Sequence, residues 1–431
     1  MARLGAFCYP GSGHINPVTA LARALELRGH NVVIFGVADI EQRVRAAGIQ
    51  YHQIGAADFP AGTIKASDEL LSRLRGMAAF RFTIERIASS ARMILRDGPA
   101  AVRHERIDAL LVDEVDVAGT IGEHLGLPFL SIAIIPPMNQ SDQIPPVFFG
   151  WRPGTSWLSR FRNRMGLRLL KWIGKPLSDL LNEKRDEWGL KRLAGPIEAL
   201  SPIARIALMP RAFEFELATP PGNLFYTGPW VNAAQRPPVE FPWDKLDGRQ
   251  LIYASLGTLQ NGSESVFRTI ADACSGLPVQ LVIALGGGLK PEQLGPLAGN
   301  PVVVSFAPQL DLLKRADVVI THAGINTVLE SLSEGVPLVA IPLGNDQPGV
   351  AARLRERRVG VVIRPGKLSP ARLRRAVRLL LEDPNYRTRA QQLGHTIREI
   401  DGPAAAAEII ERSLRLFPPF SGAQIAHEPR H

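Results

Sequence analysis

The chain has 431 residues, of which 45% are hydrophobic and 21% are charged, and its formal net charge is +9. This length is too great for one ordinary hydrophobic core, whereas two domains of about 200 residues fit it. No apolar run reaches the roughly 18–20 residues of a membrane-spanning helix, and the first apolar stretch is too short for a secretory leader. We therefore expect a globular, cytoplasmic protein.

The basic residues are concentrated in two segments. Residues 151–175 contain seven Arg or Lys and no acid, and residues 353–378 contain ten beside a single acid, Glu356. Neither segment belongs to a recognisable nucleic-acid module, so no nucleic-acid partner is predicted. We interpret the second segment as a solvated helix face. Cys8 and Cys274 have apolar neighbours, which predicts buried thiols rather than a disulfide.

Apolar, β-branched runs alternate with helical patterns along the chain, which indicates βαβ units and parallel sheets. The predicted strands of the first half are 5–10, 31–37, 109–115, 129–135, 205–209 and 224–228. Those of the second half are 251–257, 279–285, 302–307, 318–322, 337–343 and 360–363. The predicted fold class is α/β, with two Rossmann-like domains.

A Pro-rich segment of weak periodicity separates the two halves and predicts a linker over 232–248. We expect an N-terminal domain over 1–231 and a C-terminal domain over 249–401. An amphipathic helix over 402–416 follows, and 417–431 are expected to form a flexible tail.

The first glycine turn, YPGSGHINP over 9–17, follows the first strand. It lacks the third glycine of a dinucleotide-binding loop and the Gly-Lys-Ser/Thr of a P-loop. Instead it places His14 at a helix start, at the carboxyl edge of the sheet. A neutral imidazole there suits a general base that activates an alcohol. A capping or packed histidine is the alternative.

A carboxylate behind His14 would fix its tautomer and stabilise the imidazolium. Asp113 closes the strand ALLVD and reaches the same sheet edge, with Glu114 and Asp116 close by. Asp113 is the predicted partner of His14. Asp116 in that role, and Asp113 as a cap of the next helix, remain alternatives.

The most informative segment is 306–347, which reads FAPQLDLLKRADVVITHAGINTVLESLSEGVPLVAIPLGNDQ. A buried strand ends at His322, and Gly324 then opens a helix whose free N–H groups form a ready anion site. Glu330 lies on the helix face of Asn326 and Thr327. A further strand brings Asp346 and Gln347 to the sheet's carboxyl end. This order of groups suits a nucleotide sugar.

This segment resembles the donor box of the family 1 UDP-dependent glycosyltransferases, whose fold is GT-B, two facing Rossmann-like domains with a donor and acceptor cleft. The resemblance implies that His14 and Asp113 are catalytic and that the C-terminal helix packs back on the first domain. It also implies a donor-binding set. In that set Phe306 stacks on the uracil ring, and Gln309 with the backbone at Ala307 reads the uracil edge. The diphosphate is held by His322, Asn326 and Thr327. Glu330 binds the ribose, and Asp346 with Gln347 binds the sugar.

The sequence departs from the plant members of the family at two positions. Phe306 replaces a tryptophan and offers a smaller stacking face, and Ile325 replaces the tryptophan beside the sugar. The class of donor, a UDP-sugar, is therefore better defined than the choice of glucose among sugars.

No Asp-x-Asp occurs in the chain, so the usual acidic metal clamp is missing. The turn containing Ser255, Gly257 and Thr258 follows a strand, and its amides, with the helix start at Gly324, can neutralise the leaving diphosphate. We expect a metal-independent transfer with inversion that needs no cofactor besides the UDP-glucose co-substrate.

Residues 157–174 place apolar side chains on one helical face and basic ones on another, which predicts a cover over an apolar acceptor or contact with a membrane surface. An ordinary packed helix is the alternative. IPPVFFGW, RFRNRMG and IYASLGTLQNG resemble the bacterial zeaxanthin glucosyltransferase branch of the family. That resemblance implies a hydroxylated carotenoid acceptor and an enzyme peripheral at the inner membrane surface.

Other functions remain open at this point. The same family also acts on soluble phenols, flavonoids, sterols or macrolides. A UDP-sugar epimerase or hydrolase would keep the fold and need no acceptor. A non-catalytic lipid- or carotenoid-binding protein with retained UDP-sugar affinity belongs to a different class, and the presence of His14 argues against it.

Overall fold

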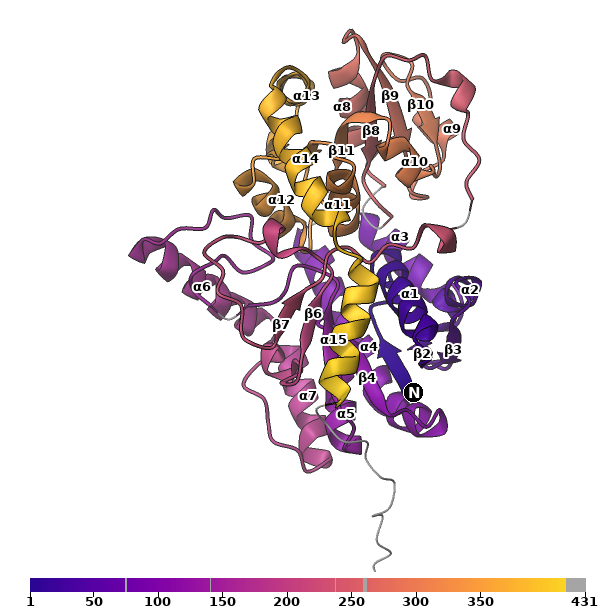
Figure 1. The fold of residues 1–431 in the computed structure, drawn as a ribbon, viewed down its shortest axis with the longest axis vertical. Coiled ribbons are helices and arrows are strands. Elements are labelled where there is room, and N and C mark those ends of the chain that lie inside the picture. The colour runs from indigo at the N-terminus through magenta and orange to yellow at the C-terminus, as the bar shows by residue number, and fades with distance from the viewer. Residues whose placement is uncertain (74–75, 140, 237, 259–261, 416–431) are drawn as a thin grey trace, which may run out of the picture.

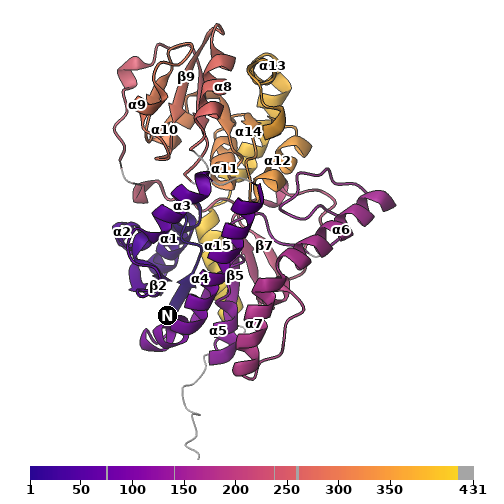
Figure 2. The same ribbon diagram turned by 180° about the vertical axis from the view of Figure 1, so that it is seen from behind.

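The computed structural model describes residues 1–431 apart from 74–75, 140, 237, 259–261 and 416–431, so the predicted tail over 417–431 lies outside the described residues. Two parallel β-sheets, each with its own helices, lie one above the other along the long axis of the molecule (Figure 1). The opposite view shows the same two bodies with α6 projecting from the lower one (Figure 2).

The lower sheet has the strand order β3-β2-β1-β4-β5-β6-β7, and all of its pairs are parallel. Among the strands that the structure describes, β3 alone was not predicted, because QYHQ is short and mostly polar. The strands of the lower sheet are β1 (Arg3–Phe7), β2 (Asn31–Gly36), β3 (Gln50–Gln53), β4 (Ala109–Asp113), β5 (Phe129–Ala133), β6 (Arg205–Ala207) and β7 (Leu224–Tyr226).

Helices and short 3-10 turns connect these strands. They are α1 (Ser12–Leu27), α2 (Ala38–Ala46), α3 (Thr63–Arg73), α4 (Gly76–His104), α5 (Gly119–Leu125), α6 (Trp157–Ile173), α7 (Lys175–Glu187), η1 (Pro196–Ala199) and η2 (Arg211–Phe213). The chain then crosses to the upper sheet through η3 (Ala233–Gln235) and η4 (Trp243–Lys245).

The upper sheet repeats the pattern with the order β10-β9-β8-β11-β12-β13, again all parallel. Its strands are β8 (Gln250–Ser255), β9 (Val279–Ala284), β10 (Val302–Val304), β11 (Ala316–Thr321), β12 (Leu338–Ala340) and β13 (Gly360–Val362). Its helices are α8 (Glu264–Cys274), α9 (Pro291–Leu294), α10 (Gln309–Leu313), α11 (Ile325–Ser333), α12 (Gln347–Glu356), η5 (Pro365–Lys367), α13 (Pro370–Glu382) and α14 (Pro384–Arg398).

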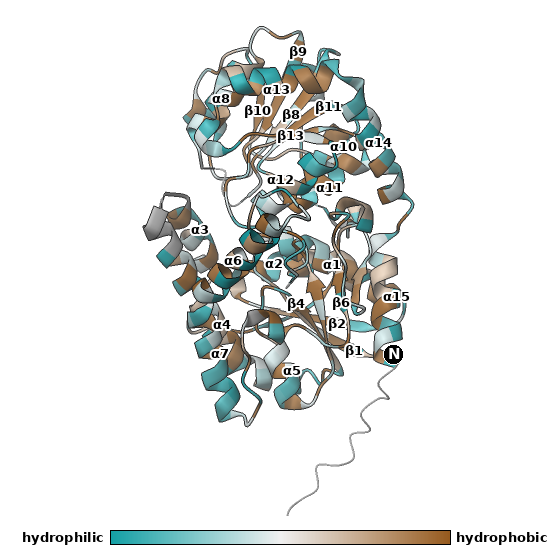
Figure 3. Cartoon of the chain, turned by 90° about the vertical axis from the view of Figure 1, so that its left-hand side faces the viewer, coloured by the Kyte–Doolittle hydropathy of each residue, from teal (hydrophilic) through white to brown (hydrophobic). Residues whose placement is uncertain are grey.

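Apart from β3, the strands are mostly apolar because both faces of each sheet are covered by helices. Figure 3 shows them as mostly hydrophobic ribbons behind helices that are striped with polar residues. Cys8 and Cys274 are buried free thiols, as their neighbours predict.

The strand order determines where a ligand can bind. Connections run in opposite directions from β1 and from β4, and they do so again from β8 and from β11. Such a reversal leaves a crevice at the carboxyl ends of the two adjacent strands, which is where open α/β sheets hold ligands. Each sheet of this protein therefore has one crevice.

A buried ion pair joins the two bodies. Arg353 of α12 donates from Nε and Nη2 to the two carboxylate oxygens of Glu214, which follows η2, at 2.8 and 2.9 Å. Both side chains are almost completely excluded from solvent, and the guanidinium also lies over the Phe215 ring. The interpretation of 353–378 as a solvated face is therefore wrong at Arg353, because its side chain is buried against Glu214, in a connection of the lower sheet.

The last described helix, α15 (Gly402–Arg415), runs back from the upper body along the lower one and packs against α1 (Figure 1). Its Glu411 accepts hydrogen bonds from Arg28 at 2.7 Å and pairs with His30 at 3.0 Å. Among the described helices, none is long and apolar enough to cross a membrane.

We predict that Arg353→Met lowers the free energy of unfolding by about 3–5 kcal/mol, because it leaves the Glu214 carboxylate buried without its counter-ion. Urea unfolding followed by tryptophan fluorescence measures this. Arg378→Met is the control, since Arg378 forms an exposed pair with Glu382 and its loss should cost about 0.5 kcal/mol or less. Equal unfolding midpoints for Arg353→Met and wild type would contradict the prediction.

Candidate active site

One cavity of about 510 Å³ lies between the two bodies and is lined by residues of both. This volume is within the range of small-molecule sites, about 300–1,000 Å³. The loops that follow β1, β4, β8 and β11 all contribute, so the cavity joins the two crevices that the sheet topology creates.

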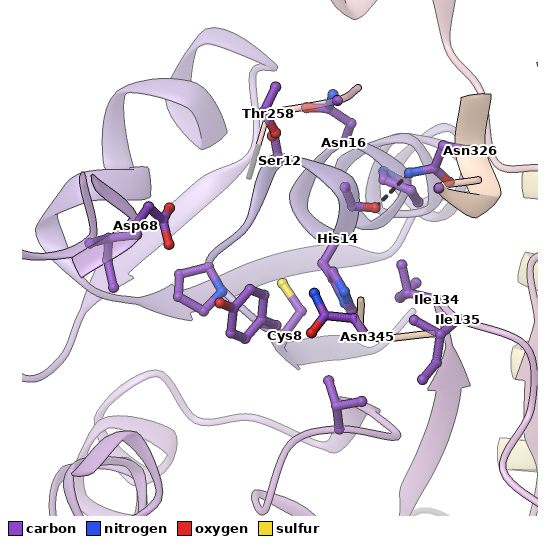
Figure 4. A pocket seen from close by; sticks show the side chains of 18 of the residues that line it. Cys8, Ser12, His14, Asn16, Asp68, Ile134, Ile135, Thr258, Asn326 and Asn345 are labelled. Carbon is purple, nitrogen blue, oxygen red and sulfur yellow. Dashed lines mark hydrogen bonds between the residues drawn. The ribbon is translucent and has the colours of Figure 1, made fainter. Parts of the chain in front are cut away.

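His14 lies in the first turn of α1, directly after β1. Its Nδ1 is 2.5 Å from Oδ2 of Asp113, the last residue of β4. The Asp113 side chain is fully buried, while His14 lines the cavity (Figure 4). Since Nδ1 is engaged by the carboxylate, Nε2 is the imidazole nitrogen left for a ligand.

The two neighbouring acids have other partners, which settles the choice that the sequence leaves open. Asp116 accepts a hydrogen bond from the backbone N–H of Ala118 at 2.9 Å. Glu114 is buried against Arg205, whose Nε donates to it at 2.7 Å. Asp113 is therefore the carboxylate that contacts His14.

Electrostatics around His14 favour its protonated form. Burial by itself lowers the pKa of His14, but the charge and hydrogen bond of Asp113, together with the charge of Asp346, outweigh it and raise the pKa above its usual value. Burial also raises the pKa of Asp346 to about 6 and that of Asp116 to about 7. The imidazole can thus accept a proton near neutral pH and keep a counter-ion.

Two glycines confine the His322 imidazole, which follows β11. A Cβ on Gly257 would lie 2.6 Å from this ring, and a Cβ on Gly324 would lie 2.5 Å from its Nε2. Gly257 also has φ of +74°, a conformation that other residues rarely adopt. Burial lowers the pKa of His322 to about 4, so this ring, which hydrogen-bonds the backbone of Ser255, is uncharged near neutral pH.

The glycine turn of the lower body meets the upper body at two hydrogen bonds. Ser12 Oγ lies 2.6 Å from Thr258 Oγ1, and the Asn326 side-chain amide donates to the Gly13 carbonyl at 2.7 Å (Figure 4). Ser255 and Gly257 line the cavity beside this contact, as do Gly324 and Thr327. Asn326, predicted to hold the diphosphate, thus bridges the two bodies.

The predicted ribose and base residues are linked to each other. Gln309 donates from Nε2 to Glu330 at 2.6 Å and accepts from the Tyr253 hydroxyl at 3.1 Å. Arg236, from the connection between the bodies, also donates to Glu330. Sequence reasoning did not identify Arg236, because its partner is 94 residues away along the chain.

Phe306 keeps an open face for stacking, since about half of the residue is exposed at the cavity wall. Ala307 lines the cavity beside it. Gly287 allows the ring to lie where it does, because a Cβ there would be 2.9 Å from Phe306 Cζ.

The loop after β12 is held in place by the side chain of Gln347, the first residue of α12. The Gln347 Oε1 accepts hydrogen bonds from the N–H groups of Leu343 and Gly344 at 2.7 and 3.0 Å. Asn345 has φ of +53°, and Ala323 in the His322 loop has φ of +71°, so both loops contain a left-handed non-glycine residue. Such strain is frequent at functional sites. Asp346, next to Asn345, lines the cavity near His14.

Sequence reasoning also missed Tyr9. Its ring lies edge-on to the His14 imidazole, with 5.3 Å between the ring centres. An aromatic residue ahead of the glycine turn was the available signal, although it does not reveal which ring it contacts.

Family models and relatives of known name match this chain. The family described as UDP-glucoronosyl and UDP-glucosyl transferase matches residues 190–402, and the glycosyltransferase family 28 N-terminal domain matches residues 11–95. The chain is 30% identical over 417 residues to a zeaxanthin glucosyltransferase of Pantoea ananas, with 96% of both chains covered. It is 29% identical to the 4'-demethylrebeccamycin synthase of Lentzea aerocolonigenes, with 95% of this chain and 99% of that protein covered.

Solved structures support the same fold. The glycotransferase of kitacinnamycin superposes with a TM-score of 0.74 at 24% identity, covering 96% of this chain and 98% of that one. A calicheamicin glycosyltransferase gives a TM-score of 0.73 at 23% identity, covering 97% and 100%. The chain thus belongs to the family 1 UDP-dependent glycosyltransferases, has their GT-B fold, and is an enzyme that transfers a sugar.

Proposed function

We propose that this enzyme transfers glucose from UDP-glucose to a hydroxyl group of an apolar acceptor, with inversion at the anomeric carbon and without a metal ion. The observation that carries the proposal is the contact between His14 Nδ1 and Asp113 at the wall of a cavity that both domains line. This contact leaves Nε2 as a general base for the acceptor.

In the proposed step the acceptor oxygen forms a bond to the anomeric carbon as the bond from that carbon to the diphosphate oxygen breaks. The acceptor proton moves to His14 Nε2, and UDP leaves. Asp113 stabilises the resulting imidazolium through Nδ1, as the carboxylate does in a catalytic triad. The negative charge of Asp346 acts in the same direction.

The proposed donor site uses the upper crevice. The start of α11 at Gly324 and the neutral His322 ring face the place where a diphosphate would lie, and a helix N-terminus favours such an anion. Phe306 offers its exposed face to the uracil, and Asp346 is placed for sugar hydroxyls. Glu330 would bind the ribose after exchanging part of its contact with Arg236 and Gln309.

The proposed acceptor site uses the lower crevice, whose wall is largely apolar. Because two relatives are named zeaxanthin glucosyltransferases, a hydroxylated carotenoid such as zeaxanthin is the first acceptor to test. The soluble phenols, flavonoids, sterols and macrolides on which the same family acts are the second class to test. The apolar lining is formed by Phe7, Phe35, Val37, Ile54, Phe59 and Ile64.

We also propose that α6 docks the enzyme on the inner membrane surface from the cytoplasm. This helix projects from the lower body (Figures 1 and 2), with Trp157 and Trp172 each more than 70% exposed. Its inward face is narrow, since only Asn163 and Gly166 are buried. The exposed apolar side chains are Trp157, Leu158, Phe161, Met165, Leu169 and Trp172. Basic residues on the same helix would meet anionic headgroups.

The product assay tests the activity. With UDP-glucose we expect UDP release and glucosylated zeaxanthin in detergent micelles, and His14→Ala should reduce the transfer rate by about 10²–10⁴-fold while UDP affinity is kept. Product mass, compared across zeaxanthin, soluble phenols and sterols, identifies the acceptor. UDP release with no acceptor product would indicate a hydrolase, and an unchanged rate for His14→Ala would remove this residue as the base.

A pH profile tests the base and its partner. For wild type we expect kcat/KM to rise with pH through a pKa above 6.5, because the base acts when neutral and its charged neighbours, Asp113 and Asp346, favour the proton. Asp113→Asn removes one of these charges, so the midpoint should shift to lower pH and the plateau rate should fall about 10²–10⁴-fold. Asp116→Asn should leave the midpoint in place. A midpoint that Asp113→Asn does not move would contradict this pairing.

Gly324→Ala tests the donor site. Its φ of −64° accepts alanine, but the new Cβ would displace the His322 ring. Overpacking of this kind costs about 1–3 kcal/mol, so the Kd for UDP should rise about 5–150-fold in isothermal titration calorimetry. Gly366→Ala, in open space, should bind UDP like wild type. Unchanged affinity in Gly324→Ala would argue against diphosphate binding at this helix start.

Sedimentation with phosphatidylglycerol vesicles tests the membrane surface. Wild type should bind, and replacing Trp157, Phe161 and Trp172 by Ser should weaken binding at least about 100-fold, since each buried apolar side chain contributes about 1.5–3 kcal/mol. Leu27→Ser with Leu379→Ser, two exposed leucines elsewhere, is the control. A wild-type protein that stays in the supernatant at low salt would refute this docking.

A further inference from the structure

A small polar group interrupts the apolar wall of the lower crevice. Asp68 of α3 and Arg86 of α4 line the cavity together with Tyr9, the residue whose ring contacts His14. Figure 4 shows Asp68 on the opposite side of the view from Ile134 and Ile135. The proposed donor and base roles do not use Asp68 or Arg86.

Of the two terminal nitrogens of the Arg86 guanidinium, one has a hydrogen-bond partner in the described structure and the other has none. Its side chain is 10% exposed, and Nη1 donates to Asp68 Oδ1 at 2.5 Å. Its Nη2 is buried, and no group in the described part of the chain accepts a hydrogen bond from it. A buried donor without a partner costs about 1–3 kcal/mol, and more if it is charged, so native proteins rarely keep one without a use for it.

Its position points to the acceptor. Both groups that the guanidinium contacts, Asp68 and the Tyr9 ring, line the cavity, and its central carbon lies 5.6 Å from the centre of that ring. The centre of the same ring is 5.3 Å from that of the His14 imidazole. The Arg86 side chain, which also lines the cavity, is therefore one aromatic ring away from the proposed base, and a rotation of its guanidinium would bring Nη2 to a molecule whose hydroxyl lies at His14.

The charges define the chemistry of the ligand group. Asp68 neutralises Arg86, and burial raises the pKa of Tyr9, so this phenol stays uncharged. A carboxylate at Nη2 would lie close to the Asp68 carboxylate and be repelled by it. An uncharged carbonyl or hydroxyl oxygen can accept the hydrogen bond without that repulsion.

We propose that Arg86 recognises an uncharged oxygen, a ketone or a second hydroxyl, that the acceptor carries about one ring length from the hydroxyl that receives the sugar. This inference rests on the proposed function and narrows its acceptor class to oxygenated apolar ring compounds. An acceptor whose ring bears only the reacting oxygen would remain a substrate, but it would leave Nη2 unpaired and react more slowly than a matched acceptor that carries the second oxygen.

A matched pair of acceptors tests this inference. The compounds 6-hydroxy-2-tetralone and 5,6,7,8-tetrahydro-2-naphthol differ only in a ketone that is not conjugated with the phenol. Wild type should prefer the ketone about tenfold or more in kcat/KM, the range expected of a hydrogen bond from a charged donor. Arg86→Lys keeps the ion pair with Asp68 but lacks the second N–H of the guanidinium, so it should lose the preference through a slower reaction of the ketone alone.

Controls separate recognition from folding and from the proposed function. Arg92→Met, an exposed position on the same helix, should keep the preference. Equal rates with both acceptors in wild type, or a full preference in Arg86→Lys, would overturn the inference and leave the transferase intact. If neither acceptor and no member of the wider panel is glucosylated, the proposed function fails. In that case the affinity of the ketone for wild type and for Arg86→Lys is measured by calorimetry. Equal affinities would overturn the proposed role of Arg86.

Discussion

The direction of the strand connections is the constraint on which this site depends. In a parallel sheet each connection must cover one face, and where the connections change face no helix covers the ends of the two strands. Here the reversal occurs between β1 and β4 below and between β8 and β11 above. His14 follows β1 and Asp113 ends β4, while Gly257 follows β8 and His322 follows β11. The contact between the proposed base and its carboxylate therefore results from strand order, although the two residues are far apart in the chain.

The two crevices form one cavity because polar contacts hold the two bodies together both near the site and away from it. Near the site, the bonds from Ser12 to Thr258 and from Asn326 to Gly13 bring the glycine turn against the upper loops. Farther away, Arg353 is buried against Glu214. A buried ion pair adds little net stability compared with apolar packing, but breaking it is costly. Such a pair favours one relative placement of the bodies, which a site shared between them requires.

Charge connects the two halves of the site. Asp346 belongs to the proposed sugar-binding loop of the upper body, yet its charge contributes to the raised pKa of His14 in the lower body. A donor sugar that engages Asp346 would alter the environment of the base at the same time. His322, in contrast, is kept neutral by burial, so it does not compete with the carboxylates for a proton. The two histidines thus have opposite electrostatic environments in one cavity.

The sequence by itself determined the elements and much of the site. Burial of both sheet faces requires continuous apolar strands, so twelve of the thirteen strands in the described part of the chain could be recognised, and the polar β3 could not. Local signals, a glycine turn or a helix start after a strand, identified His14 and His322. Tertiary structure alone decided the partners. Asp113 rather than Asp116 contacts His14, Arg236 reaches Glu330, Arg353 is buried, and Arg86 lies beyond Tyr9. Each of these pairs joins segments distant in the chain, and residue type and spacing do not specify which side chains long-range packing brings into contact.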